Sequence, residues 1–148
     1  MYGGKPDQKW LDPIPLLERT LREVEDFKPS RDFSVEFVPP GSDLEVCTDG
    51  AFIGMIAASL MMCILENCGN CTRIVMTVSE KGDNWIFSLE SIGDSIPGEC
   101  LSTSERADSR SVAFMLAWKL TEELGGTVST FSSRGKSTRM VIRLRTSG

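Results

Sequence analysis

Three cysteines have a spacing that could serve metal chemistry. Cys63, Cys68 and Cys71 follow the pattern C-x4-C-x2-C, which occurs among ligands of iron–sulfur clusters, and Cys47 or Cys100 could supply a fourth thiolate. Cluster ligands lie on an irregular loop, whereas Cys63 falls inside a strongly apolar run with the composition of a helix. On a helix, Cys63 and Cys68 would point about 140° apart. The sequence therefore favours reduced thiols that pack as small apolar side chains.

Two further patterns limit the chemistry. GKST at residues 135–138 ends like a phosphate-binding P-loop, but the first glycine of that motif would have to stand where the chain has Thr130, so the segment predicts a hairpin turn. The chain contains no histidine. This excludes Ser-His-Asp and Cys-His catalysis, histidine-ligated zinc and a phosphohistidine on these residues.

The elements that would position any site follow from hydrophobic periodicity and its stop signals. Helices are expected at 13–27, 49–70 and 111–124, and strands at 33–37, 43–49, 72–80, 84–90 and in a last hairpin at 127–145. Residues 92–110 are polar, without a period, and predict a loop. The order predicts an α+β fold, a two-layer α/β sandwich whose mixed, mostly antiparallel sheet is covered on one face by three helices.

Composition narrows the class of protein. The chain has 148 residues, 41% hydrophobic and 25% charged, which predicts one domain over residues 1–148. A net charge of −5 with interspersed signs argues against nucleic acid and against an anionic membrane surface as partners. The longest apolar run, residues 51–65, predicts a buried core helix too short to cross a bilayer. The N-terminus lacks a signal-peptide pattern, so a cytoplasmic location is expected.

Three stretches, in this order, resemble the ATP-binding catalytic domain of sensor histidine kinases, which have a Bergerat-type ATPase fold. MMCILENCGNCT at residues 61–72 resembles the N box, and SIGDSIPGE at 91–99 resembles the D-x-G-x-G-I-P-x-E loop. Residues 111–144, SVAFMLAWKLTEELGGTVSTFSSRGKSTRMVIRL, resemble the G-L-G-L helix with its Gly-Gly stop and closing hairpin. The likeness covers nearly the whole chain, with a lid shortened to the stretch within 92–110.

The resemblance implies a binding site for ATP and magnesium. Asn67 matches the asparagine that holds magnesium against the phosphates, and its amide oxygen suits a hard cation. Thr138 matches the closing threonine of the last hairpin. Cys63 stands where the family places a polar residue near the attacking group, and a buried thiol is a poor replacement.

Other matched positions have lost the expected residue types. Ser91 replaces the aspartate that accepts the adenine amino hydrogen, so a charge-assisted hydrogen bond becomes at best a neutral one. Gly93 is kept, but Ser95 replaces the next glycine. Ser111 and Ala113 replace two glycines that let backbone amides approach phosphate, and their Cβ atoms would crowd that approach.

Three of the matched positions also have a structural interpretation. Asn67 could hydrogen-bond near a helix end, Gly93 could serve a turn, and Ser111 could be the N-cap of the last helix.

Taken with the losses, the resemblance implies a degenerate histidine-kinase-type domain in two-component signalling, a pseudokinase or protein-recognition module with weak or no ATP binding. Its partner would be a histidine-bearing dimerisation domain or a response regulator. One alternative is an active catalytic domain in which Asp94 or Glu90 takes over at the adenine and Asn67 holds magnesium. Another is an anti-sigma-factor-like binding module.

Overall fold

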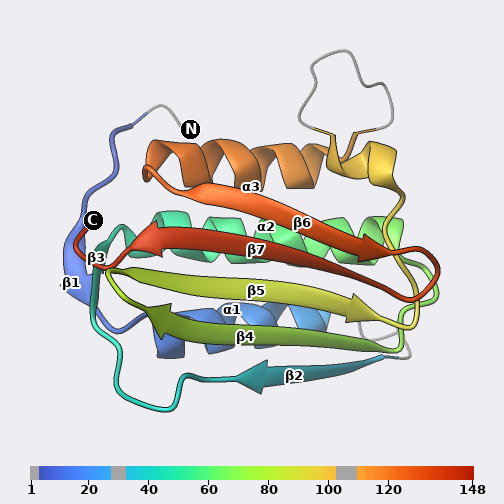
Figure 1. The fold of residues 1–148 in the computed structure, drawn as a ribbon, viewed down its shortest axis with the longest axis horizontal. Coiled ribbons are helices and arrows are strands. Elements are labelled where there is room, and N and C mark those ends of the chain that lie inside the picture. The colour runs from blue at the N-terminus through green and yellow to red at the C-terminus, as the bar shows by residue number, and fades with distance from the viewer. Residues whose placement is uncertain (1–3, 28–32, 103–109) are drawn as a thin grey trace.

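The computed structural model describes residues 4–27, 33–102 and 110–148 and arranges them in two layers (Figure 1). A five-stranded sheet with the order β2-β4-β5-β7-β6 forms one layer, and α1, α2 and α3 cover one of its faces. The sheet strands are β2 Ser34–Val38, β4 Arg73–Lys81, β5 Asn84–Ile92, β6 Thr127–Ser133 and β7 Ser137–Arg145. The helices are α1 Pro13–Phe27, α2 Gly50–Asn67 and α3 Val112–Glu123. β2 runs parallel to β4 and the other neighbours are antiparallel, so the predicted fold class is confirmed.

A second, two-stranded sheet differs from the expectation. The strand predicted at 43–49 exists as β3, Val46–Thr48, but it pairs with β1, Lys9–Leu11, rather than joining the main sheet. β1 was not predicted, because three residues are too few to show an alternating pattern. The predicted loop at 92–110 contains a short 3-10 turn, η1, at Gly98–Leu101, and residues 103–109 of the expected lid lie outside the described residues.

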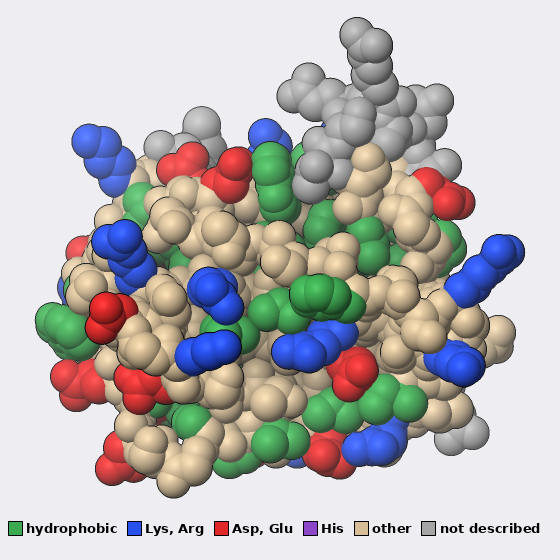
Figure 2. All heavy atoms as spheres, in the orientation of Figure 1, with side chains coloured by type: hydrophobic (Ala, Val, Ile, Leu, Met, Phe, Trp, Pro, Cys, Tyr) green, Lys and Arg blue, Asp and Glu red, His purple; other side chains and the backbone are tan. Residues whose placement is uncertain are grey.

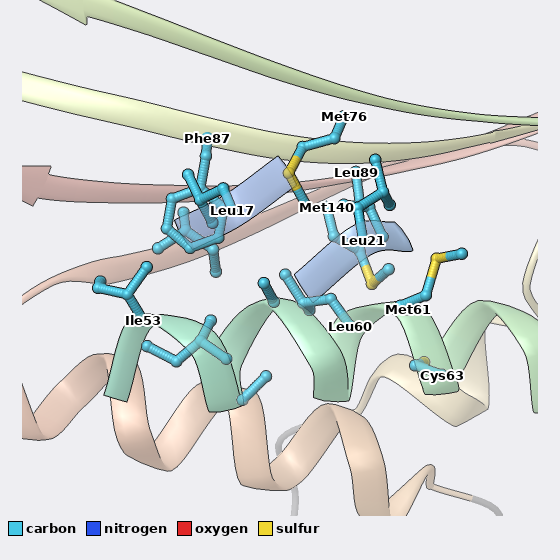
Figure 3. Close-up of a cluster of buried hydrophobic side chains, with 14 of the residues drawn as sticks. Leu17, Leu21, Ile53, Leu60, Met61, Cys63, Met76, Phe87, Leu89 and Met140 are labelled. Atoms are coloured by element: carbon cyan, nitrogen blue, oxygen red, sulfur yellow. The ribbon is translucent and has the colours of Figure 1, made fainter. Parts of the chain in front are cut away.

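The central helix α2 is apolar nearly all round because it is covered on several sides. α1 and α3 pack against its flanks, and the inward side chains of the sheet lie over it (Figure 3). Fully buried core residues include Leu17 and Leu21 of α1, Ile53 and Leu60 of α2, and Met76, Phe87, Leu89 and Met140 of the strands. The core thus forms between the helical layer and the sheet.

α2 is longer than the apolar run that predicted it. Its 18 residues are long and apolar enough to span a membrane, which corrects the expectation of too short a segment. More than half of the helix is buried inside the fold, however, and the core helix of a soluble domain has the same length and composition. The packing therefore supports the predicted role of a core helix.

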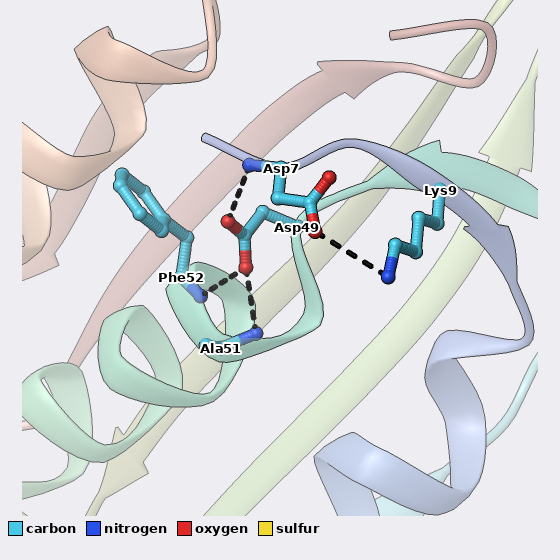
Figure 4. A network of polar contacts seen from close by, with 5 residues as sticks. All are labelled: Asp7, Lys9, Asp49, Ala51 and Phe52. Atoms are coloured by element: carbon cyan, nitrogen blue, oxygen red, sulfur yellow. Dashed lines mark hydrogen bonds and ion pairs between the residues drawn. The ribbon is translucent and has the colours of Figure 1, made fainter. Parts of the chain in front are cut away.

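The start of α2 is fixed by one carboxylate (Figure 4). Asp49 Oδ1 accepts hydrogen bonds from the backbone N–H groups of Ala51 at 3.0 Å and Phe52 at 3.3 Å, and Oδ2 accepts from the N–H of Asp7 at 2.7 Å. The side chain satisfies helix-end amides that have no partner inside the helix and places a negative charge at the positive end of the helix dipole. It also ties the segment before β1 to the main fold.

We expect Asp49→Ala to lower the free energy of unfolding by about 1–2 kcal/mol, because it removes the N-cap of the central helix. Asp49→Asn keeps an acceptor oxygen and is the matched control, with a smaller loss expected. Urea unfolding followed by circular dichroism measures both. Equal stability of Asp49→Ala and the wild type would show that the cap contributes nothing.

Candidate functional site

Ser91 lies on the inward face of β5, close to its end, and is fully buried. It is directly opposite Thr138 of β7 in the strand register. Its hydroxyl donates to the carbonyl oxygen of Thr138 at 3.4 Å and approaches that of Asp94 at 3.5 Å. Both acceptors are backbone groups of this same chain, and the Cys68 thiol is a further hydrogen-bond partner, so the hydroxyl at the expected adenine position is already used inside the protein.

Thr138 is also fully buried and engaged on its side chain. Its Oγ1 accepts from the backbone N–H of Ile96 at 2.8 Å and lies 3.0 Å from Ser132 Oγ. Ile96 is itself 2% exposed and belongs to the core. The closing threonine therefore anchors the loop after β5 to the last hairpin.

Ser95, which replaces a glycine of the matched motif, adds a second link between the loop after β5 and the last hairpin. Its hydroxyl accepts from the backbone N–H of Gly135 at 2.9 Å, in the turn between β6 and β7. The N–H of Gly93 donates to the carbonyl oxygen of Lys136 at 2.8 Å in the same turn. The loop is thus held against the hairpin by bonds that include a side chain a glycine could not supply, and the sequence pattern gave no sign of this tie.

Gly93 occupies a backbone position that other residues rarely adopt. Its φ is +100°, and a Cβ there would lie 2.7 Å from Thr72 Oγ1 and 3.0 Å from the Thr72 nitrogen. Both features require glycine whether or not a nucleotide binds. The interpretation as a turn glycine accounts for its retention.

Asn67 is the last residue of α2 and is half-buried. Its Nδ2 donates to the carbonyl oxygen of Cys63 at 2.9 Å, as the structural interpretation expected. The amide oxygen has no hydrogen bond from the described residues, so it can still bind a cation. Among these residues there is no cluster of three or more acidic or cysteine side chains that could hold a metal, so magnesium would need the phosphates as further ligands.

Ser111 is the N-cap of α3, which confirms that structural interpretation. Its Oγ accepts from the backbone N–H of Phe114 at 3.1 Å, and its own N–H donates to the carbonyl oxygen of Cys100 at 2.8 Å. An amide in the first turn of α3, where phosphate oxygens would approach, is therefore already bonded to a side chain.

Ala113 lines a shallow groove between α2 and α3 of about 340 Å³. Its neighbours there include Met62, Glu66, Val112 and Leu116, so its wall is mainly apolar with one carboxylate. Within residues 4–27, 33–102 and 110–148, no lysine or arginine lines this groove. Such a lining is unsuited to a triphosphate, whose negative charge requires cations or free amides.

Cys63 is a buried thiol rather than a reactive group. Burial raises its pKa from 9.0 to about 11, while hydrogen bonds from Ser111 and Asn67 act in the opposite direction. The thiol is therefore neutral at physiological pH and is neither a base nor a nucleophile there. Burial also raises the pKa of Cys68, which caps the end of α2.

This shift predicts a pH dependence. Because the folded pKa of Cys63 lies above its ordinary value, the stability it contributes is complete below pH 9 and is lost as the pH rises towards 11. We expect the melting temperature to fall more between pH 9 and pH 11 in the wild type than in Cys63→Ala.

At pH 8, iodoacetamide should modify the half-buried Cys47 before Cys63, as peptide mass spectrometry would show. Equal labelling of the two thiols in the folded protein would contradict the assignment.

The two acids considered as substitutes at the adenine differ in orientation. Glu90 precedes Ser91 on the same strand, so its side chain lies on the opposite face of the sheet and cannot reach the same position. Asp94 lines a groove of about 690 Å³ between the loop at 94–99 and the hairpin turn with Arg134 and Gly135. Its Oδ1 accepts from the Ser95 N–H at 2.8 Å. Of these two acids, only Asp94 lies near a space that a ligand could enter.

The structure therefore brings most of the predicted residues together. Ser91, Gly93 and Thr138 meet where β5, β7 and the following loop converge, and the hydrogen bond between Ser111 and Cys63 places the start of α3 one helical turn from Asn67. Ala113 is separate, because it faces the groove between the two helices.

Solved structures of histidine kinase catalytic domains have the same fold as this chain. The nucleotide-free catalytic domain of histidine kinase ThkA matches with a TM-score of 0.82 at 16% identity, covering 95% of this chain and 98% of that chain. The ATP-binding domain of PrrB from Mycobacterium tuberculosis matches with a TM-score of 0.77 at 19% identity, covering 96% and 99%. Full-length ShkA, solved with AMPPNP, matches with a TM-score of 0.82 at 11% identity over 98% of this chain and 32% of that chain.

No protein-family model and no curated protein sequence matches the chain. The identities to the solved structures are low, so these matches establish the fold. The resemblance inferred from the three sequence stretches is confirmed at that level: the chain has the fold of a histidine kinase catalytic domain.

Proposed function

We propose that this chain, built on the histidine kinase catalytic fold, is a degenerate member of that group with weak or no ATP binding. It acts in two-component signalling as a pseudokinase, recognising a protein partner. The partner is a histidine-bearing dimerisation domain or a response regulator. The proposal rests on the fold shared with solved histidine kinase domains and on the hydrogen bonds that side chains at the expected nucleotide site make within the protein.

One observation carries the proposal. Three serines stand where an active site would have an aspartate and two glycines, and each hydroxyl is bonded within the protein: Ser91 to Thr138, Ser95 to Gly135, and Ser111 to Phe114. The hydrogen bond from Gly135 to Ser95 holds the loop after β5 against the hairpin of β6 and β7. The hydrogen bond from Phe114 to Ser111 occupies a backbone amide at the start of α3. A nucleotide would have to break or bypass these bonds, and the free energy of doing so opposes binding.

The groups that remain for a nucleotide are few. Asn67 would hold a magnesium ion through its amide oxygen, and such an ion would neutralise charge on the phosphates. The groove between α2 and α3, which Ala113 lines, offers apolar side chains and the carboxylate of Glu66. This lining supports weak binding of the phosphates even with the metal present.

A phosphotransfer assay tests the proposal. The protein is mixed with a separately produced histidine-bearing dimerisation domain and ATP labelled on its γ-phosphate, with the catalytic domain native to that dimerisation domain as positive control. We expect no label on the histidine above background. Transfer of label that is lost in Asn67→Ala would refute the proposal and establish an active kinase.

The active-kinase alternative is favoured by one specific observation. Asp94 lines the open groove beside the hairpin turn, and its carboxylate has one oxygen engaged by Ser95. If this carboxylate accepts the adenine amino group, Asp94→Asn would abolish the transfer of label in the same phosphotransfer assay. If the protein does not bind ATP, Asp94→Asn and the wild type would give the same result.

A further inference from the structure

The face of the sheet that the helices do not cover carries apolar side chains among its polar and charged ones. When one face of an antiparallel sheet meets water, the outward positions of its strands are normally polar. Here the outward positions include Ile86 of β5, Val141 of β7 and Phe131 of β6. Phe131 is 59% exposed, although it is a large apolar side chain. This pattern indicates a surface that contacts another molecule.

Three cations surround these apolar side chains. Lys81, Arg139 and Arg143 line a shallow groove of about 470 Å³ over β4 to β7, together with Ile86 and Phe131. Figure 2 shows lysine and arginine side chains beside hydrophobic ones on this face. No acidic side chain among the described residues lines the groove, although the chain as a whole has a net charge of −5. The groove is thus locally positive on an acidic protein.

These cations have no ion pair with any described residue, in contrast to a neighbour on the same face. Arg73 of β4 pairs with Glu36 of β2 at 3.1 Å. Glu90 stands opposite Arg139 in the strand register, yet the two side chains are not within ion-pair distance. Arg139 and Arg143 therefore keep their guanidinium groups available for carboxylates of another molecule.

We propose that this groove docks an acidic, partly apolar segment of a partner protein. Carboxylates of the segment pair with Arg139 and Arg143, and an apolar side chain between them packs on Phe131. Arginine and aromatic residues are the types enriched at the energetic centres of protein interfaces. Nucleic acid is the weaker candidate, because three cations on a protein of net charge −5 neutralise few phosphates. The surface serves the proposed recognition role but lies apart from the nucleotide site.

Peptide binding tests this proposal by fluorescence anisotropy. The probe is a fluorescein-labelled nonapeptide of alternating glutamate and valine, with the lysine–valine peptide as its counterpart. We expect saturable binding of the acidic peptide only, weakened about tenfold or more in Arg139→Glu/Arg143→Glu. The matched control is Arg19→Glu/Lys119→Glu, which makes the same change in net charge at exposed sites on α1 and α3 and should bind as the wild type does. Thermal melts confirm that each variant is folded.

A second variant separates the apolar contact from charge alone. Phe131→Ser should weaken binding of the acidic peptide about tenfold without changing net charge, because it removes the aromatic side chain that the bound peptide covers. The proposal is wrong if the Arg139/Arg143 variant binds as the wild type does, if the control pair weakens binding equally, or if a nine-nucleotide single-stranded DNA binds more tightly than the peptide. Absence of peptide binding would exclude this surface as a docking site, while the result of the phosphotransfer assay, and so the proposed function, would be unaffected.

Discussion

Ser91→Asp, which restores the residue type of an active site, is expected to lower the free energy of unfolding by about 3 kcal/mol or more at pH 7. The side chain is fully buried; the carbonyl oxygens of Thr138 and Asp94 are its acceptors, and the Cys68 thiol is a further hydrogen-bond partner. A hydroxyl can donate to these acceptors, whereas a carboxylate can only face them with its own negative charge. The introduced acid would therefore be uncompensated unless it took up a proton.

Urea unfolding at several pH values measures this effect. The introduced carboxyl has a raised pKa in the folded state, so the deficit should be greatest at pH 7 and shrink as the pH falls and the group becomes neutral. Ser91→Ala is the control and should cost about 1 kcal/mol, the value of a lost neutral hydrogen bond. If Ser91→Asp were as stable as the wild type, the position would be open to water as in a working adenine site.

Gly93→Ala is expected to destabilise the protein by about 3 kcal/mol, since backbone strain and steric overlap act together. The φ of +100° is unfavourable for any residue with a Cβ, and that atom would meet Thr72 Oγ1 at 2.7 Å and the Thr72 nitrogen at 3.0 Å. A backbone nitrogen cannot rotate away as a side chain can. The strand ends at β4 and β5 would have to separate.

Thermal and urea unfolding of matched variants test this expectation. Gly98→Ala, a glycine with no atom within 4 Å of the added Cβ and no positive φ, should change stability by less than about 0.5 kcal/mol. Thr72→Ala combined with Gly93→Ala should recover part of the loss, because the nearest contact is removed. A harmless Gly93→Ala would mean that the turn can adopt another conformation, and a nucleotide role would then be needed to explain the glycine.

The main elements could be predicted because their signals are local. Asp49 and Ser111 stand directly before apolar periodic runs, and both prove to be N-caps. The hairpins follow from alternating runs around short turns. The pairing of β1 with β3 could not be predicted, because it joins two three-residue strands far apart in the chain and depends on tertiary packing.

The site could be predicted in part. Matching the motifs identified Ser91 and Thr138, which the structure places opposite each other. The orientation of Glu90 was readable from the strand, since Phe87 and Leu89 mark the inward positions and Glu90 falls between Leu89 and Ser91. The tie from Ser95 to Gly135 was not readable, because it joins residues 40 apart through one hydroxyl whose direction no local pattern specifies.

Isothermal titration calorimetry of the wild-type protein with a non-hydrolysable ATP analogue and magnesium tests the central claim most directly. It measures whether a nucleotide binds at all to a site in which the serine hydroxyls and the loop after β5 are hydrogen-bonded within the protein. We expect no saturable heat, which corresponds to a dissociation constant weaker than about 1 mM. Saturable binding near 1:1 with a dissociation constant of about 10 μM or tighter, lost in Asn67→Ala, would contradict the account.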